Sequence, residues 1–510
     1  MESSSNPVRL RSWPAVCLFL MLAAVACGPP GSPPTQQHSV VLITIDTLRP
    51  DRLACYGHPA NNTPNIDRLA AEGALFEHAY CDMPWTTGSM ASVMTGHYSA
   101  YHGLRDPRSK LDPAVSTLAQ IVHDHGMQTG AVVGSFPLDS VYGLNKGFET
   151  YDDKFSMPEL VDPNAPVNPV TESYPQNWDE QTKFVQKKEE NDWYRPDADV
   201  TAAAIQWLNN TRDGRPFFLW VHYFGPHEKY DRTRSTFPQE REVVVAYDGA
   251  VQQTDRAVGR LIDHLRETGL LDKTMVILHA DHGQNLGESG YVGHTLRLDE
   301  VAVHIPMIVR YPGTMGAGVK RVDIAKNVDI LPTVLALENI PAEAGPGRSL
   351  LPVGGDLDGN RVPKDLQVAY FETYLPLYFF WPQTTPETGA LLGPMISRGV
   401  RTPNWKLTTN EFRGSCSWGH APARDGNGTW VLSEPRTLTA ERCAELGAKN
   451  LFRVAGDNGG TIEPLSVPDP AVVSVLEQQI HAHDSAEPAG EKFNLTPTQE
   501  EKLKSLGYLK

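Results

Sequence analysis

The sequence is short of positive charge, with 45 Lys and Arg residues against 61 Asp and Glu residues and a formal net charge of −16. A surface this acidic has no general attraction for nucleic acid or anionic lipid, so nucleic acid is not expected as a partner. If the substrate is an anion, its attraction must come from the binding site itself, most simply from a bound cation.

Long apolar runs are also lacking, apart from one near the N-terminus. Residues Pro14–Ala26 follow two arginines and are too few to span a bilayer, which is typical of the hydrophobic core of a signal peptide. The run ends in small residues directly before Cys27, as in a bacterial lipobox; a plain cleaved signal peptide is the alternative. We therefore expect a signal peptide over 1–26, then a lipidated Cys27 and flexible tether over 27–38. The protein would face the periplasm or cell exterior, with a lipid anchor as its only contact with the membrane.

The cysteine content is low as well, at six in the whole chain. Setting aside Cys17 in the signal peptide and Cys27 as the lipid site leaves four, and four cysteines permit three pairings. Sequence proximity favours Cys55–Cys81 and Cys416–Cys443, with four free thiols as the alternative.

Short, nearly continuous apolar runs recur through the first two thirds of the chain, as in strands buried on both faces of a parallel sheet. They are Ser39–Ile45, Gly130–Val133, Phe217–Val221, Met275–Leu278 and Ile305–Val309. Helix-like stretches accompany them: Asn65–Glu72, Val115–His125, Ala198–Asn209, Val243–Thr268 and Val328–Leu337. This alternation predicts an α/β fold whose mostly parallel central sheet is covered by helices on both sides.

The character of the sequence changes after Pro341, where Gly- and Pro-rich connections join short strand-like pieces such as Gln367–Phe371 and Trp405–Thr408. We predict a catalytic domain over residues 39–344 and a smaller α+β subdomain over residues 345–510.

Two of the predicted strands end in acidic residues. Asp46 follows the first run, and Asp281 and His282 follow the fourth. Because ligands bind beyond the carboxyl ends of strands in open α/β sheets, these three side chains could converge there. Acidic residues after strands are also common without any function.

A third element lies at Pro84–Gly96, which reads as a turn leading into a short helix. Thr86 or Thr87 lies at its start, where free backbone N–H groups and the helix dipole favour an anion. A plain threonine N-cap is the alternative interpretation of this segment.

Several ordered motifs of this chain resemble those of bacterial sulfatases, a branch of the alkaline phosphatase superfamily. They are Val41–Gly57, Thr63–Ala70, Met94–Gly96 with His102-Gly103, Phe217–His227, Asp281–Gly283 and the closing Leu503–Leu509. The resemblance runs from residue 39 to the end and implies the fold of that superfamily, a mixed and mostly parallel sheet between helices.

The resemblance places Thr86 where sulfatases carry the cysteine or serine that becomes formylglycine. Threonine cannot be oxidised to formylglycine, so that cofactor is not expected. Gly88 and Met90 stand where the family has proline and arginine, while Ser89 matches the family's serine and is a candidate substrate-binding residue. Thr47 replaces the second of two adjacent acids, which is closer to the related phosphodiesterases and phosphonate hydrolases.

Four residues together resemble one complete metal site of that branch: Asp46, Thr86, Asp281 and His282. A divalent cation held there would lower the pKa of the Thr86 hydroxyl and make it a usable nucleophile. Mixed nitrogen and oxygen ligands favour zinc or manganese, and calcium or magnesium are the alternatives.

Three histidines complete the candidate site. His227 lies in Gly225-Pro226-His227, where the family commonly shows Asp-Pro-His, and would contact the anionic oxygens of the substrate. His294 falls where sulfatases place a lysine near the leaving group and could act as the general acid. His222 is a further candidate for substrate binding. For each histidine the alternative is an ordinary hydrogen-bonded residue.

The predicted activity is metal-dependent hydrolysis of sulfate, phosphate or phosphonate esters, with Thr86 as nucleophile. The substrate would be an anionic ester, for example on a glycan or a lipid headgroup. Two alternatives remain: a transferase of a phospho-headgroup on the same fold, and a non-catalytic binding protein on a decayed sulfatase scaffold.

Overall fold

A computed structural model describes residues 38–483, with gaps. The residues it leaves undescribed are 61, 108, 156–193, 212–213, 228–239, 289–291, 296, 342–344, 364–365, 375–394, 413–421, 425–429, 433–448, 456–460 and 466–468. Cys27, the leader, Cys416 and Cys443 therefore lie outside the described residues.

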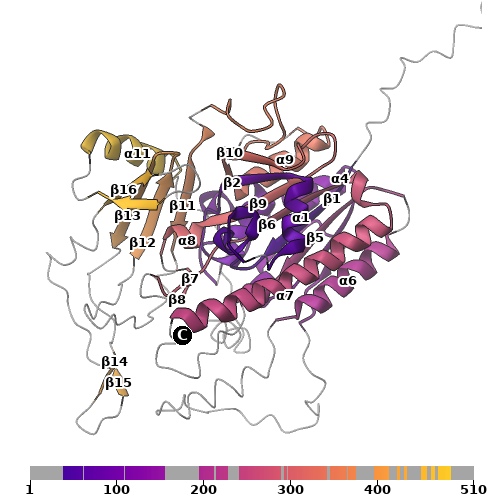
Figure 1. Ribbon diagram of the computed structural model, residues 1–510, viewed down its shortest axis with the longest axis horizontal. Coiled ribbons are helices and arrows are strands. Elements are labelled where there is room, and N and C mark those ends of the chain that lie inside the picture. Colours follow the sequence, from indigo (N-terminus) through magenta and orange to yellow (C-terminus); the bar gives the residue numbers. More distant parts are fainter. Residues whose placement is uncertain are drawn as a thin grey trace, which may run out of the picture. The chain divides into compact units, whose positions relative to one another are not determined.

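The central feature is an eight-stranded sheet with the order β10-β2-β9-β6-β1-β5-β3-β4 (Figure 1). Its strands are β1 (Ser39–Ile45), β2 (Ala74–Tyr80), β3 (Gln128–Val133), β4 (Thr150–Asp152), β5 (Phe217–Tyr223), β6 (Thr274–Ala280), β9 (His304–Arg310) and β10 (Val319–Lys326). Every neighbouring pair is parallel except the two that involve β9, which runs against both β6 and β2. The predicted mixed, mostly parallel sheet is confirmed.

Helices pack around this sheet in two groups. Helices α1 (Pro64–Glu72) and α6 (Asp197–Asn210) both contact the long α7 (Glu240–Glu267), and Figure 1 shows α6 and α7 side by side. A second group has α2 (Thr86–Thr95) in contact with α4 (Leu118–Asp124) and α9 (Ile330–Leu337). In the part of the chain that the structure describes, no helix combines the length and the apolarity that crossing a membrane requires.

All five strands and all five helices named from the sequence are present, with shifted ends. The sequence analysis missed three strands of the sheet: β4, which is only three residues long, and β2 and β10, whose charged residues interrupt the apolar pattern. The charged residues of β10 are nevertheless inside the protein. Arg321 and Asp323 are buried and form an ion pair with each other, at 2.7 Å between Nε and Oδ1.

A second, antiparallel sheet follows the first, with the order β11-β12-β13-β16-β17. Its strands are β11 (Ala369–Thr373), β12 (Met395–Arg401), β13 (Trp405–Phe412), β16 (Asn450–Ala455) and β17 (Thr461–Pro464), and α11 (Pro470–His483) packs on it. Both short strands predicted after Pro341 belong to this sheet. Shorter elements are α3 (Ser99–His102), α8 (Glu300–Val303), β7 (Asn285–Leu286), β8 (Val292–Gly293), β14 (Pro422–Arg424) and β15 (Trp430–Leu432).

The favoured pairing of Cys55 with Cys81 is wrong, because the structure holds both as free thiols. Cys81 is buried at the end of β2, where its Sγ donates to the carbonyl of Ala302 at 3.7 Å. Cys55 is only partly buried, and its backbone N–H donates to Asp67 instead. Closeness in sequence did not bring these two side chains together.

Candidate active site

Three side chains that could ligate a metal meet at the carboxyl ends of two neighbouring parallel strands. Asp46 follows β1, and Asp281 and His282 follow β6, which pairs directly with β1. One ligand atom from each residue lies within 4.8 Å of the others, and all three side chains are fully buried. The convergence predicted from the strand ends is therefore present.

The hydrogen bonds of the site leave ligand atoms facing inward. Oδ1 of Asp281 accepts the backbone N–H groups of Thr47 (3.1 Å) and His282 (2.7 Å), while its Oδ2 and the Oδ1 of Asp46 have no hydrogen-bond partner in the described structure. Nδ1 of His282 donates to the carbonyl of Gly283 at 2.9 Å. The lone pair of its Nε2 therefore faces the carboxylates, 3.5 Å from Asp281 Oδ2 and 3.8 Å from Asp46 Oδ1.

The electrostatics of this cluster favour a cation. Burial, and next the neighbouring carboxylate of Asp281, raise the pKa of Asp46 well above its usual range. Buried polar atoms without partners are uncommon in folded proteins and call for an explanation. A divalent cation ligated by both carboxylates and the imidazole would neutralise them, so the donor set fits the metal that the sequence predicted.

Thr86 lies beside this cluster, fully buried, as the first residue of α2. The N-cap of α2 is Trp85, and no side chain caps the helix, so the interpretation of Thr86 as a plain N-cap is wrong. The Thr86 hydroxyl instead donates to Asp46 Oδ2 at 3.4 Å and lies 3.2 Å from His282 Nε2. Thr87 donates to the carbonyl of Pro137 at 2.7 Å, away from the metal-ligating atoms.

The residues after Thr87 explain two departures from the sulfatase pattern. A Cβ on Gly88 would lie 2.7 Å from the sulfur of Met83 and 2.8 Å from the ring of Trp85, so this position has no room for proline. Met90 is fully buried in the main hydrophobic core. An arginine there would have to be buried in apolar surroundings.

Ser89 contacts the backbone of Asp281, one of the three candidate metal ligands. Its hydroxyl donates to the carbonyl of Asp281 at 2.6 Å and accepts from Asn327 Nδ2 at 3.1 Å. These bonds hold the end of β6 against α2. A contact of Ser89 with substrate stays a prediction.

His227 and His294 lie together, with 3.0 Å between their Nε2 atoms. Nδ1 of His294 faces the carbonyl of Pro84 at 3.3 Å and must carry a proton to bond it. The rings of His294 and His282 are 4.4 Å apart, which places the histidine pair next to the predicted metal ligand. One proton can therefore be shared by the two facing nitrogens beside His282.

His222 is fully buried near the end of β5, under the metal cluster. Its Nδ1 is 2.8 Å from Thr44 Oγ1, and its Nε2 lies 3.6 Å from Asp46 Oδ2. Burial lowers the pKa of His222 to about 4, so the ring is neutral at physiological pH. Its Nε2 has no hydrogen-bond partner in the described structure, and the predicted contact with substrate stays a prediction.

Two residues shape the site through a contact that the sequence does not reveal. Thr47 adopts a left-handed conformation, with φ of 56°, which is strained for a β-branched residue. Tyr247 in α7 donates its hydroxyl to the Thr47 carbonyl at 2.7 Å and accepts from Arg49 N at 2.9 Å. These hydrogen bonds hold the Thr47 backbone so that its N–H points at Asp281. Tyr247 and Thr47 are 200 positions apart in the chain, so no local sequence pattern predicts their contact.

Comparison with known proteins gives a consistent result. Residues 38–340, more than half of the chain, match the sequence family described as Sulfatase. The N-acetylglucosamine-6-O-sulfatase of Bacteroides thetaiotaomicron is 23% identical over 462 residues, covering 73% of this chain and 81% of that protein. Arylsulfatase A of Homo sapiens is 28% identical over 352 residues, covering 63% and 67%. The structure of a phosphonate monoester hydrolase of Agrobacterium radiobacter is similar in fold, with a TM-score of 0.55 at 18% identity, covering 88% of this chain and 94% of the other.

Proposed function

Because this chain belongs to the sulfatase family and is thereby an ester hydrolase, we propose that it cleaves sulfate, phosphate or phosphonate esters with Thr86 as its nucleophile. The observation that carries the proposal is the contact of the Thr86 hydroxyl with Asp46 and His282 inside the candidate metal cluster. A threonine that only capped a helix would not have its hydroxyl aimed at metal-ligating atoms.

The chain's own residues supply most of the chemistry. The Thr86 oxygen attacks sulfur or phosphorus while the first turn of α2 directs its N–H groups and positive dipole end at the anion. His294, or His227 through their shared proton, protonates the departing oxygen. Water then cleaves the ester on Thr86 and regenerates the hydroxyl. When bound, a divalent cation would lower the pKa of the Thr86 hydroxyl and stabilise negative charge on the ester oxygens.

We propose an anionic ester on a glycan as the substrate. The name of the Bacteroides relative supports this choice, since it describes a sulfatase of an amino sugar. The similar fold of a phosphonate monoester hydrolase, together with threonine in place of an oxidisable cysteine, supports a phosphoryl centre as well.

We also propose, from the sequence alone, that the protein is exported and anchored by lipid at Cys27. Mass spectrometry of the mature N-terminus tests this point. An acylated Cys27 is expected, and an unmodified first residue other than Cys27 would rule out the anchor.

A panel of substrates tests the activity directly. Protein stripped of metal should be assayed on aryl sulfate, phosphate monoester, phosphodiester and phosphonate esters, with zinc, manganese, calcium and magnesium added in turn. We expect turnover of at least one ester class that depends on added metal and is faster with zinc or manganese. A protein that binds these metals and turns over none of the esters would instead be a binding protein.

A further inference from the structure

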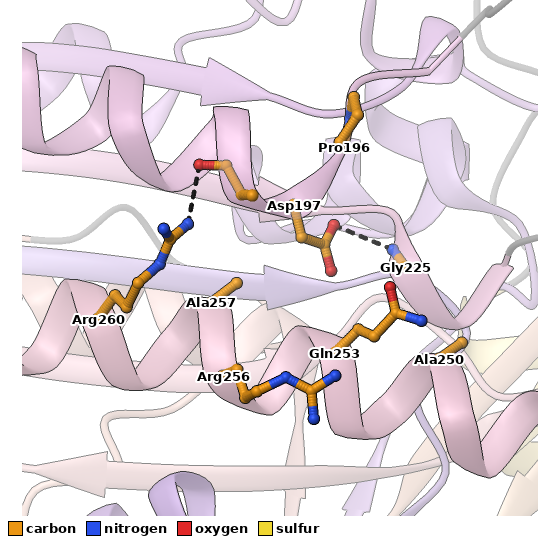
Figure 2. A pocket seen from close by; sticks show the side chains of 9 residues that line it. Pro196, Asp197, Gly225, Ala250, Gln253, Arg256, Ala257 and Arg260 are labelled. Carbon is orange, nitrogen blue, oxygen red and sulfur yellow. Dashed lines mark hydrogen bonds between the residues drawn. The ribbon is translucent and has the colours of Figure 1, made fainter.

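Gly225 has no room for a side chain, although it stands where the family motif commonly has aspartate. A Cβ there would lie 2.2 Å from Oγ1 of Thr254 and 2.4 Å from Oδ2 of Asp197. Asp197 belongs to the first turn of α6 (Figure 2), and Thr254 belongs to α7, so side chains from two other elements fill the space. A carboxylate is therefore present at this place, but a different part of the chain supplies it.

The Asp197 carboxylate is bonded on both oxygens to groups outside its own helix. Its Oδ1 accepts the backbone N–H groups of Phe224 and Gly225, each at 3.1 Å, and the second of these bonds is drawn in Figure 2. Its Oδ2 accepts from the hydroxyl of Thr254 at 2.5 Å. The side chain does not cap α6, whose N-cap is Pro196 without a side-chain bond. Asp197 thus holds the short helix η5 (Gly225–His227) rather than its own helix.

The short helix η5, which Asp197 holds, ends at His227. The ring of His227 stacks on the ring of Phe224, with 4.5 Å between centroids and 22° between planes, and its N–H donates to the Phe224 carbonyl at 2.9 Å. Nε2 of His227 then meets Nε2 of His294. A continuous set of contacts therefore runs from Asp197 through Phe224 and His227 to the candidate general acid.

We propose that Asp197 is a positioning residue, which fixes His227 against His294 through its two backbone hydrogen bonds and replaces the carboxylate that Gly225 lacks. The proposal rests on the proposed function, in which this histidine pair delivers a proton to the leaving group. The described hydrogen bonds of Asp197 go to the turn and to Thr254, and it acts on the candidate ligand Asp46 only through the electrostatic effect of its charge.

The surroundings of Asp197 offer a matched control. A cavity of about 370 Å³ lies between the start of α6 and α7, and Asp197 and the exposed Arg256 both line it (Figure 2). Arg256→Gln changes the charge beside this cavity by one unit without touching the turn. Because such surface substitutions are usually close to neutral, it should leave kcat/KM within about twofold of the parent.

Two substitutions at Asp197 separate hydrogen bonding from charge. Asp197→Ala removes both bonds to the turn and should lower kcat/KM by about tenfold or more, because small displacements of a reacting group are costly in rate. Asp197→Asn keeps them, since its amide oxygen can accept both N–H groups while its nitrogen donates to Thr254. It should stay within about threefold of the parent, with metal content unchanged in both variants.

The same Asp197→Ala change in a His227→Ala background completes a double-mutant cycle. If Asp197 acts through His227, its loss should cost less than about twofold there. Equal losses in both backgrounds, or a normal kcat/KM for Asp197→Ala in the parent, would overturn the proposal.

NMR of the imidazole groups gives a readout that does not depend on turnover. Asp197→Ala should shift the signals of His227 and His294, whereas Asp197→Asn should leave them as in the parent. Unmoved signals in Asp197→Ala would contradict the proposal. If the parent is inactive on every ester, the proposed function fails while this spectroscopic test still stands.

Discussion

Each candidate ligand in this site has one atom bonded to a neighbouring residue and another that faces the other candidate ligands. Asp281 bonds backbone N–H groups through Oδ1 and leaves Oδ2 without a partner in the described structure, and His282 bonds a carbonyl through Nδ1 and turns Nε2 toward the Thr86 hydroxyl. Asp46 receives the Thr86 hydroxyl on Oδ2 and leaves Oδ1. Such committed bonds fix the orientation of ligands before a metal arrives.

The buried carboxylates predict opposite effects of Asp46→Asn with and without metal. Without metal, Asp46→Asn should have a higher free energy of unfolding than the parent. The substitution removes a buried charge and its repulsion by Asp281. Zinc or manganese at about 100 times its Kd should stabilise the parent by ~2.7 kcal/mol and the variant much less. Denaturant unfolding with and without metal measures both differences. Equal metal stabilisation of the two proteins would remove Asp46 from the ligand set.

The position of His294 predicts a dependence on the leaving group. His294→Gln should reduce kcat by roughly 10²–10⁴-fold for esters of poorly acidic alcohols, whose oxygen needs a proton to depart. For nitrophenyl esters the loss should be much smaller, because nitrophenolate leaves unprotonated. His227→Gln is the paired variant, since the two rings share a proton. A loss that is equal for both kinds of leaving group would assign His294 to substrate binding instead.

At the scale of elements, a buried polar network ties α2 to the rest of the fold. The N–H of Leu104 donates to Nδ1 of His102, whose Nε2 lies 3.0 Å from the hydroxyl of Ser92. Ser92 in turn donates to Asp82 at 2.6 Å, and Asn327 donates to the other oxygen of Asp82 at 2.6 Å. The network links α2 and α3 to η7 (Asn327–Asp329) and so holds the helix that begins at Thr86.

This network predicts a pH dependence of stability. Burial lowers the pKa of His102 from 6.5 to about 3, so the unfolded chain binds a proton there before the folded protein does. The contribution is therefore fully present above pH 6.5 and is lost as pH falls toward about 3. Between those limits the free energy of unfolding of the parent should fall more steeply than that of His102→Gln, by up to ~1.4 kcal/mol per pH unit. Parallel pH profiles for the two proteins would show that His102 titrates normally.

The strands that the sequence predicted most clearly are those with apolar side chains buried on both faces of the sheet. Strands such as β1 and β6, buried on both faces, are continuous apolar runs and were found from the sequence, and with them the strand ends that carry Asp46 and Asp281. Strand β10 was missed because Arg321 and Asp323 neutralise each other inside the protein, which composition alone does not reveal. Asp197 was also not predicted. An acidic residue in the first turn of a helix usually interacts with the dipole of that helix, whereas Asp197 bonds a turn elsewhere in the chain.

At the scale of the whole molecule, the order and direction of the strands bring the residues of the site together. Five neighbouring strands of the sheet, β6, β1, β5, β3 and β4, run parallel to one another. The carboxyl ends of β1, β5 and β6 therefore bring together the residues at positions 46, 222 and 281. The motif resemblance predicted this set, because ordered motifs determine a fold. Long-range contacts, such as that of Tyr247 with Thr47, depend on packing that no local pattern encodes.

The most direct test of the central claim compares Thr86→Ala with Thr87→Ala on the best substrate of the panel, with metal content measured in both. Thr86→Ala should lose at least about three orders of magnitude in kcat while it keeps bound metal, since three ligands remain. Thr87→Ala loses only a hydrogen bond to Pro137, worth ~1 kcal/mol of stability, and should remain active. Thr86→Ala with near-normal kcat would contradict the account, whatever the behaviour of Thr87→Ala.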